Sequence, residues 1–190
     1  NGAQIAVDEI NASDSAVKFE YNFQDDEGDA ETAVNAYNIL KDWGMQVLMG
    51  TVTTAPCLAV ISETEADNMF QITPSASSTD VIVPDNVFQV CFTDPNQGVS
   101  AADYIADNGL ATKVAAIYDS SDAYSSGIYN AFAAEAEAKG LEIVCAEAFT
   151  ADNKTDFRTQ LQKAQSAGAD LVFLPIYYQE AALILTQADQ

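Results

Sequence analysis

The stretch that decides the fold is Val47-Leu48-Met49-Gly50-Thr51-Val52-Thr53-Thr54. Val47–Met49 is a short apolar run, and hydroxyl side chains follow Gly50 before the next apolar, helix-like segment. This pattern is typical of a buried parallel strand, a turn and the start of a helix. A second short strand, expected over 69–72, is followed in the same way by Thr73-Pro74-Ser75-Ala76-Ser77-Ser78-Thr79. Two neighbouring strands therefore end in hydroxyl-rich loops.

These two loops form a candidate anion site. Ligands of open α/β sheets bind beyond the carboxyl ends of the strands, where free backbone N–H groups and helix N-termini attract negative charge. Short hydroxyl side chains at that place suit a carboxylate. The alternative interpretation is that the serines and threonines only cap helices.

Strand and helix patterns alternate along the rest of the chain. The spacing of apolar residues predicts strands over 17–23, 45–49, 69–72, 87–92, 113–118, 141–146 and 170–175. It predicts helices over 2–11, 30–42, 55–67, 99–108, 126–139, 155–167 and 179–188, and Asp29 is expected to cap the second of them. Such alternation predicts an α/β fold with parallel sheets and right-handed crossovers.

A candidate domain boundary lies at Thr93-Asp94-Pro95-Asn96-Gln97-Gly98, which interrupts the pattern after the strand expected over 87–92. We therefore expect two α/β lobes, formed by residues 1–94 and 95–190. A single continuous sheet is the alternative.

Composition excludes several classes of function. Twenty-nine acidic residues against seven basic ones give a net charge of −22, which disfavours nucleic acid and anionic membrane surfaces as partners. No run of apolar residues reaches the length of a membrane span, so no direct membrane insertion is expected. The acidic run at 24–29 lacks the ligand spacing of a calcium loop and is expected to be a solvated turn.

The motifs of catalysis and cofactor binding are missing from the sequence. It contains no histidine, no GxGxxG, no Walker A loop and no GxSxG, and its three cysteines are far apart. These absences argue against a Ser-His-Asp or Cys-His nucleophile and against catalytic zinc. We expect no catalytic residues, no metal and no cofactor.

Tyrosines follow two strands of the second series. Tyr124 ends the run 118–124, and Tyr177 lies in the run 176–180. A tyrosine at that place offers an apolar wall with a polar tip, which suits a small amphipathic ligand. The alternative is that each tyrosine only packs a surface turn.

Five segments taken together resemble a known family. The segments are Gly2-Ala3-Gln4-Ile5-Ala6-Val7-Asp8-Glu9-Ile10-Asn11, Asp25-Asp26-Glu27-Gly28-Asp29, Gly50-Thr51-Val52-Thr53-Thr54, Ile72-Thr73-Pro74-Ser75-Ala76-Ser77 and Asp119-Ser120-Ser121-Asp122-Ala123-Tyr124. In this order they resemble the type I periplasmic binding proteins of the branched-chain amino-acid (Leu/Ile/Val) group. The resemblance implies two Rossmann-like lobes. The family has a strand before the helix at Gly2 and continues beyond Gln190, so we expect a chain incomplete at both ends.

The resemblance also implies a ligand site. It assigns the Thr54 hydroxyl to the ligand's α-carboxylate, with Thr53 beside it. It assigns the Ser75 carbonyl to the α-ammonium, and the hydroxyl and N–H of Ser77 to the carboxylate, with Ala76 between them. Tyr124 and Tyr177 of the second lobe would close over the ligand.

The function implied is that of an extracytoplasmic receptor, periplasmic or extracellular and with or without a lipid anchor. It would bind an amino acid, branched-chain or related, by lobe closure and deliver it to the membrane permease of an ABC importer. A ligand-sensing module of the same fold in a receptor or regulator is the alternative, and an enzyme is the third reading.

Overall fold

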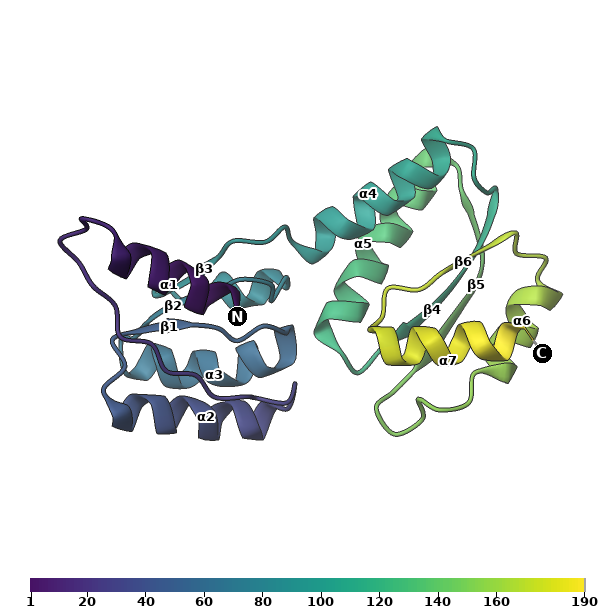
Figure 1. The fold of residues 1–190 in the computed structure, drawn as a ribbon. Helices are drawn as coiled ribbons and strands as arrows, with labels where there is room; N and C mark the ends of the chain where they lie inside the picture. Colours follow the sequence, from purple (N-terminus) through teal and green to yellow (C-terminus); the bar gives the residue numbers. More distant parts are fainter. Residues whose placement is uncertain (190) are drawn as a thin grey trace.

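The computed structural model describes residues 1–189, and helices and strands alternate along them (Figure 1). The elements are α1 (Gly2–Ala12), α2 (Ala30–Trp43), β1 (Val47–Met49), α3 (Thr54–Ala66), β2 (Phe70–Thr73), the short 3₁₀ helix η1 (Thr79–Ile82), β3 (Val87–Gln89), α4 (Asp94–Asp107), β4 (Lys113–Asp119), α5 (Ala123–Lys139), β5 (Glu142–Phe149), α6 (Arg158–Ser166), β6 (Leu171–Phe173) and α7 (Tyr178–Ala188).

The strands form two separate parallel sheets, as expected of two lobes and against the single-sheet alternative. Their orders are β1-β2-β3 and β5-β4-β6. Met49 pairs with Ile72, and Thr73 pairs with Gln89, so the strands of the first sheet end almost level. The loops after β1 and β2 therefore lie together at one edge of the sheet. Figure 1 shows the two lobes side by side, joined by the chain between β3 and α4.

The first lobe has its core between the sheet and the helices α2 and α3. Ala33, Tyr37, Leu48 and Val60 pack there, and the Tyr37 hydroxyl donates to Asp67 Oδ2 at 2.7 Å. Asp67 also forms an ion pair with Lys41.

The expected parallel strand is present as β1, but only its central residue is buried. Leu48 is buried, but Val47 and Met49 are 53% and 58% exposed. The reason is that α2 and α3 cover one face of this sheet, and the side chains of a strand alternate between its two faces.

The prediction of a strand over 17–23 was wrong. This segment is extended but belongs to neither sheet of the described residues. Its hydrogen bonds go to a side chain instead, because the Phe19 N–H donates to Asn11 Oδ1 at 2.8 Å and Asn11 Nδ2 donates to the Phe19 carbonyl at 2.7 Å. Alternating polarity produces a strand only where a second strand is available to pair with it.

The turn that follows matches its prediction. The N–H groups of Glu27 and Gly28 donate to the carboxylates of Asp25 and Asp26, and the Thr32 N–H donates to Asp29 Oδ1 at 2.8 Å. Asp29 is thus the N-cap of α2, as predicted.

The second lobe is built on β4, where Val114 to Ile117 are all fully buried. Ala102, Ile105, Phe132 and Ala136 of α4 and α5 pack with Val114 in one cluster. A second cluster joins Ile117 to Phe149, Phe157 and Ile184. The two clusters make β4 the central element of a core with helices on both sides.

The interruption expected over 93–98 is a helix start instead. Thr93 is the N-cap of α4, and Pro95 lies in its first turn, where its missing N–H costs nothing. Gly98 serves packing rather than a turn, because a Cβ at this position would lie 2.4 Å from the Ile128 carbonyl oxygen of α5. Sequence reading took these two residues for loop signals.

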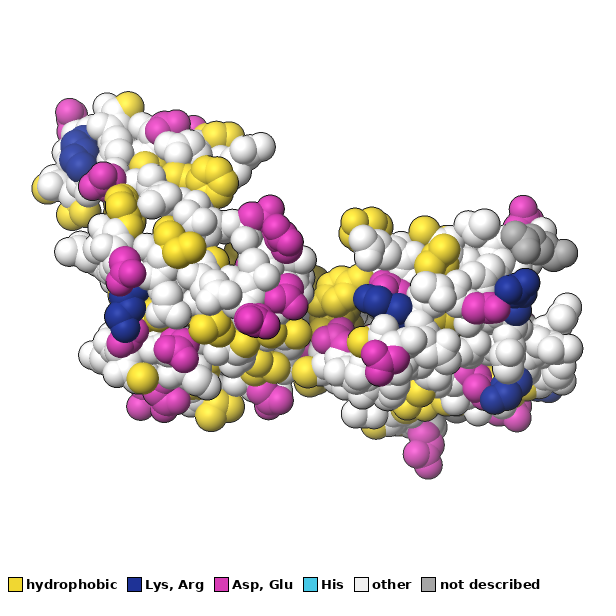
Figure 2. Space-filling model, turned by 90° about the horizontal axis from the view of Figure 1, so that it is seen from below, with side chains coloured by type: hydrophobic (Ala, Val, Ile, Leu, Met, Phe, Trp, Pro, Cys, Tyr) yellow, Lys and Arg dark blue, Asp and Glu magenta, His cyan; other side chains and the backbone are white. Residues whose placement is uncertain are grey.

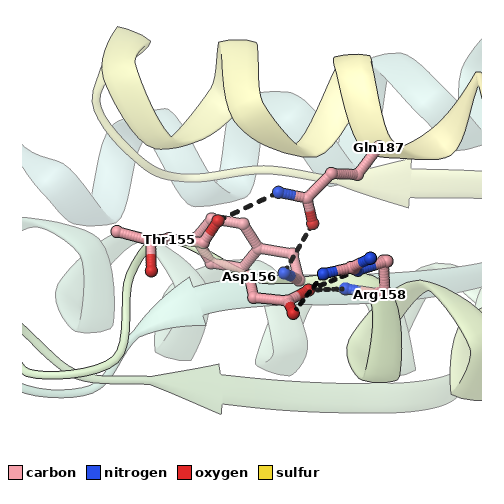
Figure 3. Close-up of polar contacts among 5 residues, drawn as sticks. Thr155, Asp156, Arg158 and Gln187 are labelled. Atoms are coloured by element: carbon pink, nitrogen blue, oxygen red, sulfur yellow. Dashed lines mark hydrogen bonds and ion pairs between the residues drawn. The ribbon is translucent and has the colours of Figure 1, made fainter.

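Helix α6 begins three residues later than expected, and Figure 3 shows the reason. Gln187 of α7 accepts from the Phe157 N–H at 2.7 Å and donates to the Thr155 carbonyl at 3.0 Å. Asp156 and Arg158 pair at 2.7 Å in the same segment. These contacts hold residues 155–157 outside the helix and fasten α7 to the segment that leads into α6.

Candidate functional site

The loop after β1 is fixed by a buried polar network. The Gln71 side chain, which is fully buried, donates through Nε2 to the Gly50 carbonyl at 2.9 Å and accepts from Thr64 Oγ1 at 2.8 Å. The Gly50 N–H donates to the Ile72 carbonyl at 2.9 Å. A satisfied buried network of this kind gives the loop one defined conformation.

The loop after β2 is tied to the first loop through Thr73. Its hydroxyl donates to the Thr51 carbonyl at 2.7 Å and accepts from the Ala76 N–H at 3.0 Å. Gln89 of β3 donates to the Ala76 carbonyl at 2.6 Å. Sequence reasoning missed Gln71 and Thr73 as loop-fixing residues; the available signal was a polar side chain on the inward face of a predicted strand.

The hydroxyls of Thr53 and Thr54 have no hydrogen-bond partner among the described residues, although both oxygen atoms are buried. Thr54 as a whole is 1% exposed. Thr53 occupies the N-cap position of α3 but makes no side-chain cap, so the interpretation of these threonines as helix caps was wrong. A buried hydroxyl without a partner costs about 1–3 kcal/mol, and such a group calls for an explanation.

The two tyrosines of the second lobe lie against each other. Tyr124 is in the first turn of α5, Tyr177 precedes α7, and their rings stack with centroids 4.8 Å apart. Burial and the nearby Asp122 raise the pKa of Tyr177, and the nearby backbone N–H of Thr54 opposes this rise. Tyr177 therefore reaches across from the second lobe to the start of α3.

Asp94 lies where the chain passes from one lobe to the other. It is 2% exposed, and its N–H donates to the Ser77 carbonyl at 2.8 Å. Oδ1 accepts from Gln97 Nε2 at 3.3 Å, while Oδ2 has no partner among residues 1–189. Burial raises the pKa of this carboxyl group, and the Ser77 hydroxyl opposes the rise.

Sequence reasoning did not name Asp94 as a candidate site residue. An Asp directly before a Pro is typical of the start of a helix, so its presence there needed no functional explanation. Nothing in the sequence pattern signalled that this carboxylate is buried.

The structure brings most of the predicted site residues together. Tyr177 stacks on Tyr124 and lies near the Thr54 N–H. The buried Ser77 is bonded through its carbonyl to the N–H of Asp94, whose carboxylate is close enough to raise the pKa of Tyr124. Two predicted residues differ from this group. Ser75 is exposed, and the N–H and carbonyl of Ala76 are both already bonded within the first lobe.

A separate groove of about 310 Å³ lies in the first lobe between residues 20–24 and β1. Thr51 and Pro74 line it, but none of the predicted site residues does. Within the described part of the chain, no helix combines the length and the hydrophobicity needed to cross a membrane.

The model of one protein family, described as periplasmic binding protein, matches residues 1–190. The chain belongs to the periplasmic binding protein family. This result confirms the family resemblance and the fold class inferred from the sequence.

Relatives and solved structures agree with this assignment. The chain is 32% identical over 190 residues to Leu/Ile/Val-binding protein homolog 3 of Brucella melitensis, covering 98% of this chain and 51% of that protein. The leucine-binding protein LivK of Thermotoga maritima superposes with a TM-score of 0.90 at 29% identity, over 100% of this chain and 54% of that one.

A further structure is LivJ of Streptococcus pneumoniae in complex with isoleucine, with a TM-score of 0.88 at 29% identity over 99% of this chain and 54% of that one. The chain thus spans about half the length of the relatives it matches. The names of these three relatives describe binding proteins.

Proposed function

We propose that the chain forms part of a solute receptor that binds an amino acid between its two lobes. The observation that carries this proposal is the pair of buried, unpartnered hydroxyls of Thr53 and Thr54 at the start of α3. The printed names of the relatives, which include Leu/Ile/Val-binding and leucine-binding proteins, support an aliphatic amino acid as the ligand.

A carboxylate satisfies these groups. It accepts hydrogen bonds only, so it would take the Thr53 and Thr54 hydroxyls as donors together with free N–H groups of the first turn of α3. The positive end of the helix dipole adds to the attraction. Each hydrogen bond to a charged group contributes about 1.5–3 kcal/mol, which offsets the cost of burying the ligand's charge.

The tyrosine pair gives the site its second wall. The stacked rings of Tyr124 and Tyr177 present an apolar surface from the second lobe, and the Tyr177 hydroxyl lies near the Thr54 N–H. A bound carboxylate would take over this N–H and leave the phenol to contact the ligand. Closure of the two lobes around the ligand follows from site residues that come from both of them.

The proposal also includes the compartment in which the receptor acts and the protein to which it passes its ligand. The chain would act outside the cytoplasm, in the periplasm or at the cell exterior, and would hand its ligand to the permease of an ABC importer. Its role is binding without catalysis. Figure 2 shows acidic side chains spread over both lobes, which would keep the receptor away from nucleic acid and anionic surfaces.

A thermal-shift screen of the full-length protein against the twenty amino acids tests the proposal. We expect a rise of the melting temperature with a few aliphatic amino acids, because a ligand that binds only the folded state stabilises it. No rise with any of the twenty would overturn the proposed function.

A further inference from the structure

A buried serine joins two loops of the second lobe. The Ser125 residue is 1% exposed and lies in the first turn of α5, directly after Tyr124. Its hydroxyl accepts from the Asp119 N–H at 2.8 Å and donates to the Pro175 carbonyl at 2.6 Å. One hydroxyl thus links the end of β4, the start of α5 and the segment that runs from β6 to α7.

The segment after β6 has already left the sheet where this bond is made. The pairing of β4 with β6 ends at Ala116 and Phe173, whereas the pairing of β4 with β5 continues to Asp119. Among the described residues, Ser125 is the one side chain that donates a hydrogen bond to the backbone of residues 174–177. The apolar side chains at 174 and 176 pack against the core, and the hydrogen bond adds a fixed direction to that contact.

The two segments that Ser125 links carry the tyrosine pair. Tyr124 directly precedes Ser125, and Tyr177 follows closely after Pro175. The two rings stack with centroids 4.8 Å apart and an angle of 18° between the ring planes. Figure 1 shows the starts of α5 and α7 on the side of the second lobe that faces the first lobe. The spacing of the two rings therefore depends on the bond between Ser125 and Pro175.

The first lobe contains a bond of the same kind. The Thr73 hydroxyl donates to the Thr51 carbonyl of the neighbouring loop and accepts from the Ala76 N–H. In each lobe one buried hydroxyl uses its single proton and one of its acceptor sites to hold two loops of the candidate site together. Because Ser125 is buried and its proton is directed at Pro175, it can affect a ligand only through the tyrosines.

We propose that Ser125 is a positioning residue of the ligand site: its hydroxyl sets the distance between Tyr124 and Tyr177 and thereby how firmly the second lobe holds the ligand. This inference rests on the proposed function. Alanine at position 125 would leave the Asp119 N–H and the Pro175 carbonyl without this partner. The segment before α7 would then no longer be held to the start of α5, and the two rings would meet the ligand independently.

The test uses the full-length protein and the amino acid that gives the largest shift in the thermal screen, which we expect to be L-leucine. Calorimetry measures its affinity, and stopped-flow kinetics measures its rates. In Ser125→Ala the affinity should fall about 3- to 10-fold, the scale of one ordinary hydrogen bond, mainly through faster dissociation. Ser126→Ala is the matched control and should bind as the unchanged protein does, because the Ser126 hydroxyl bonds only to the carbonyl groups of residues 122 and 123 at the start of the same helix.

A double-mutant cycle separates positioning from a general loss of stability. If Ser125 acts through the tyrosine rings, Ser125→Ala should change the affinity by less than about 2-fold in a protein that already carries Tyr177→Ala. Misfolded material lowers the stoichiometry of the calorimetric titration and leaves the dissociation constant of the folded protein unchanged. Ser125→Cys has nearly the same shape but only a weak S–H donor, so it is the second variant should alanine prevent folding, and it should show the same fall.

The two proposals fail in different ways. If the amino acid binds Ser125→Ala and Ser125→Cys as tightly as the unchanged protein, the positioning role of Ser125 is refuted and the receptor function stands. The same holds if the loss caused by Ser125→Ala persists in full when Tyr177→Ala is also present. If no amino acid binds the unchanged protein, both proposals are refuted.

Discussion

The Thr73 hydroxyl joins the two loops that we assign to ligand binding, and Thr73→Val removes it with almost no change of shape. Thr73 is fully buried; it donates to the Thr51 carbonyl at 2.7 Å and accepts from the Ala76 N–H at 3.0 Å. Valine leaves both groups without this partner, and Ala76 is itself fully buried.

The expected loss follows from those two groups. A buried N–H without a partner costs about 1–3 kcal/mol, and an ordinary hydrogen bond contributes about 0.5–1.5 kcal/mol. We expect Thr73→Val to lower the free energy of unfolding by about 2–4 kcal/mol. Ligand affinity should fall as well, because the loops that carry Thr54 and Ser77 lose their link.

Urea unfolding followed by circular dichroism measures the first effect. The matched control is Thr186→Val, which removes a hydroxyl on the exposed face of α7 that bonds only to the Ala182 carbonyl of the same helix, at 2.8 Å. This variant should change the stability by less than about 0.5 kcal/mol. A loss in Thr73→Val no larger than that of the control would refute the argument that Thr73 fixes the loops.

Two further predictions concern the tyrosine wall and the first-lobe ion pair. Tyr124→Ala should raise the dissociation rate of the ligand more than it lowers the association rate, because a residue of the second lobe meets the ligand only after the ligand has bound to the first lobe. Stopped-flow kinetics measures both rates, and Tyr178→Ala, which removes the exposed tyrosine next to Tyr177, is the control. A change mainly in the association rate would contradict the assignment. Lys41 and the Tyr37 hydroxyl hold the pKa of Asp67 below its ordinary value of 3.8, so the stability that this carboxylate contributes is present above that value and is lost as the pH falls below it. Asp67→Asn should therefore flatten the decline of the urea midpoint in acid, and an unchanged acid profile would count against this role of Asp67.

The sequence predicted most of the fold because the elements that form the core have regular apolar patterns. The run around β4 and the helices α2 and α5 follow the expected periods, and their residues are buried as those periods require. The failures lie where a pattern depends on a partner elsewhere. Residues 17–23 alternate like a strand but pair with none in the described chain. Gly98 signals a turn locally but serves the contact between α4 and α5.

The candidate site stays a prediction, and the sequence named only some of the residues that form it in the structure. Hydroxyls after two adjacent strands and tyrosines after two later strands point to a ligand site on general grounds, and the family resemblance assigned each of these residues a role at the ligand. Gln71 and Thr73 could have been noticed as polar side chains on the inward face of a predicted strand, but Asp94 was out of reach, because its burial and its unpartnered oxygen come from the folded chain. A sequence period tells which face a residue takes but not whether its polar atoms are satisfied.

The most direct test of the central claim is a calorimetric titration of the full-length protein with L-leucine, compared with its Thr54→Ala and Thr54→Ser variants. The account predicts that Thr54→Ala weakens binding by about 1.5–3 kcal/mol, the scale of a hydrogen bond to a charged group, while Thr54→Ser, which keeps a hydroxyl at the start of α3, remains close to the unchanged protein. Equal affinity in all three proteins would contradict the claim that this buried hydroxyl binds the ligand's carboxylate.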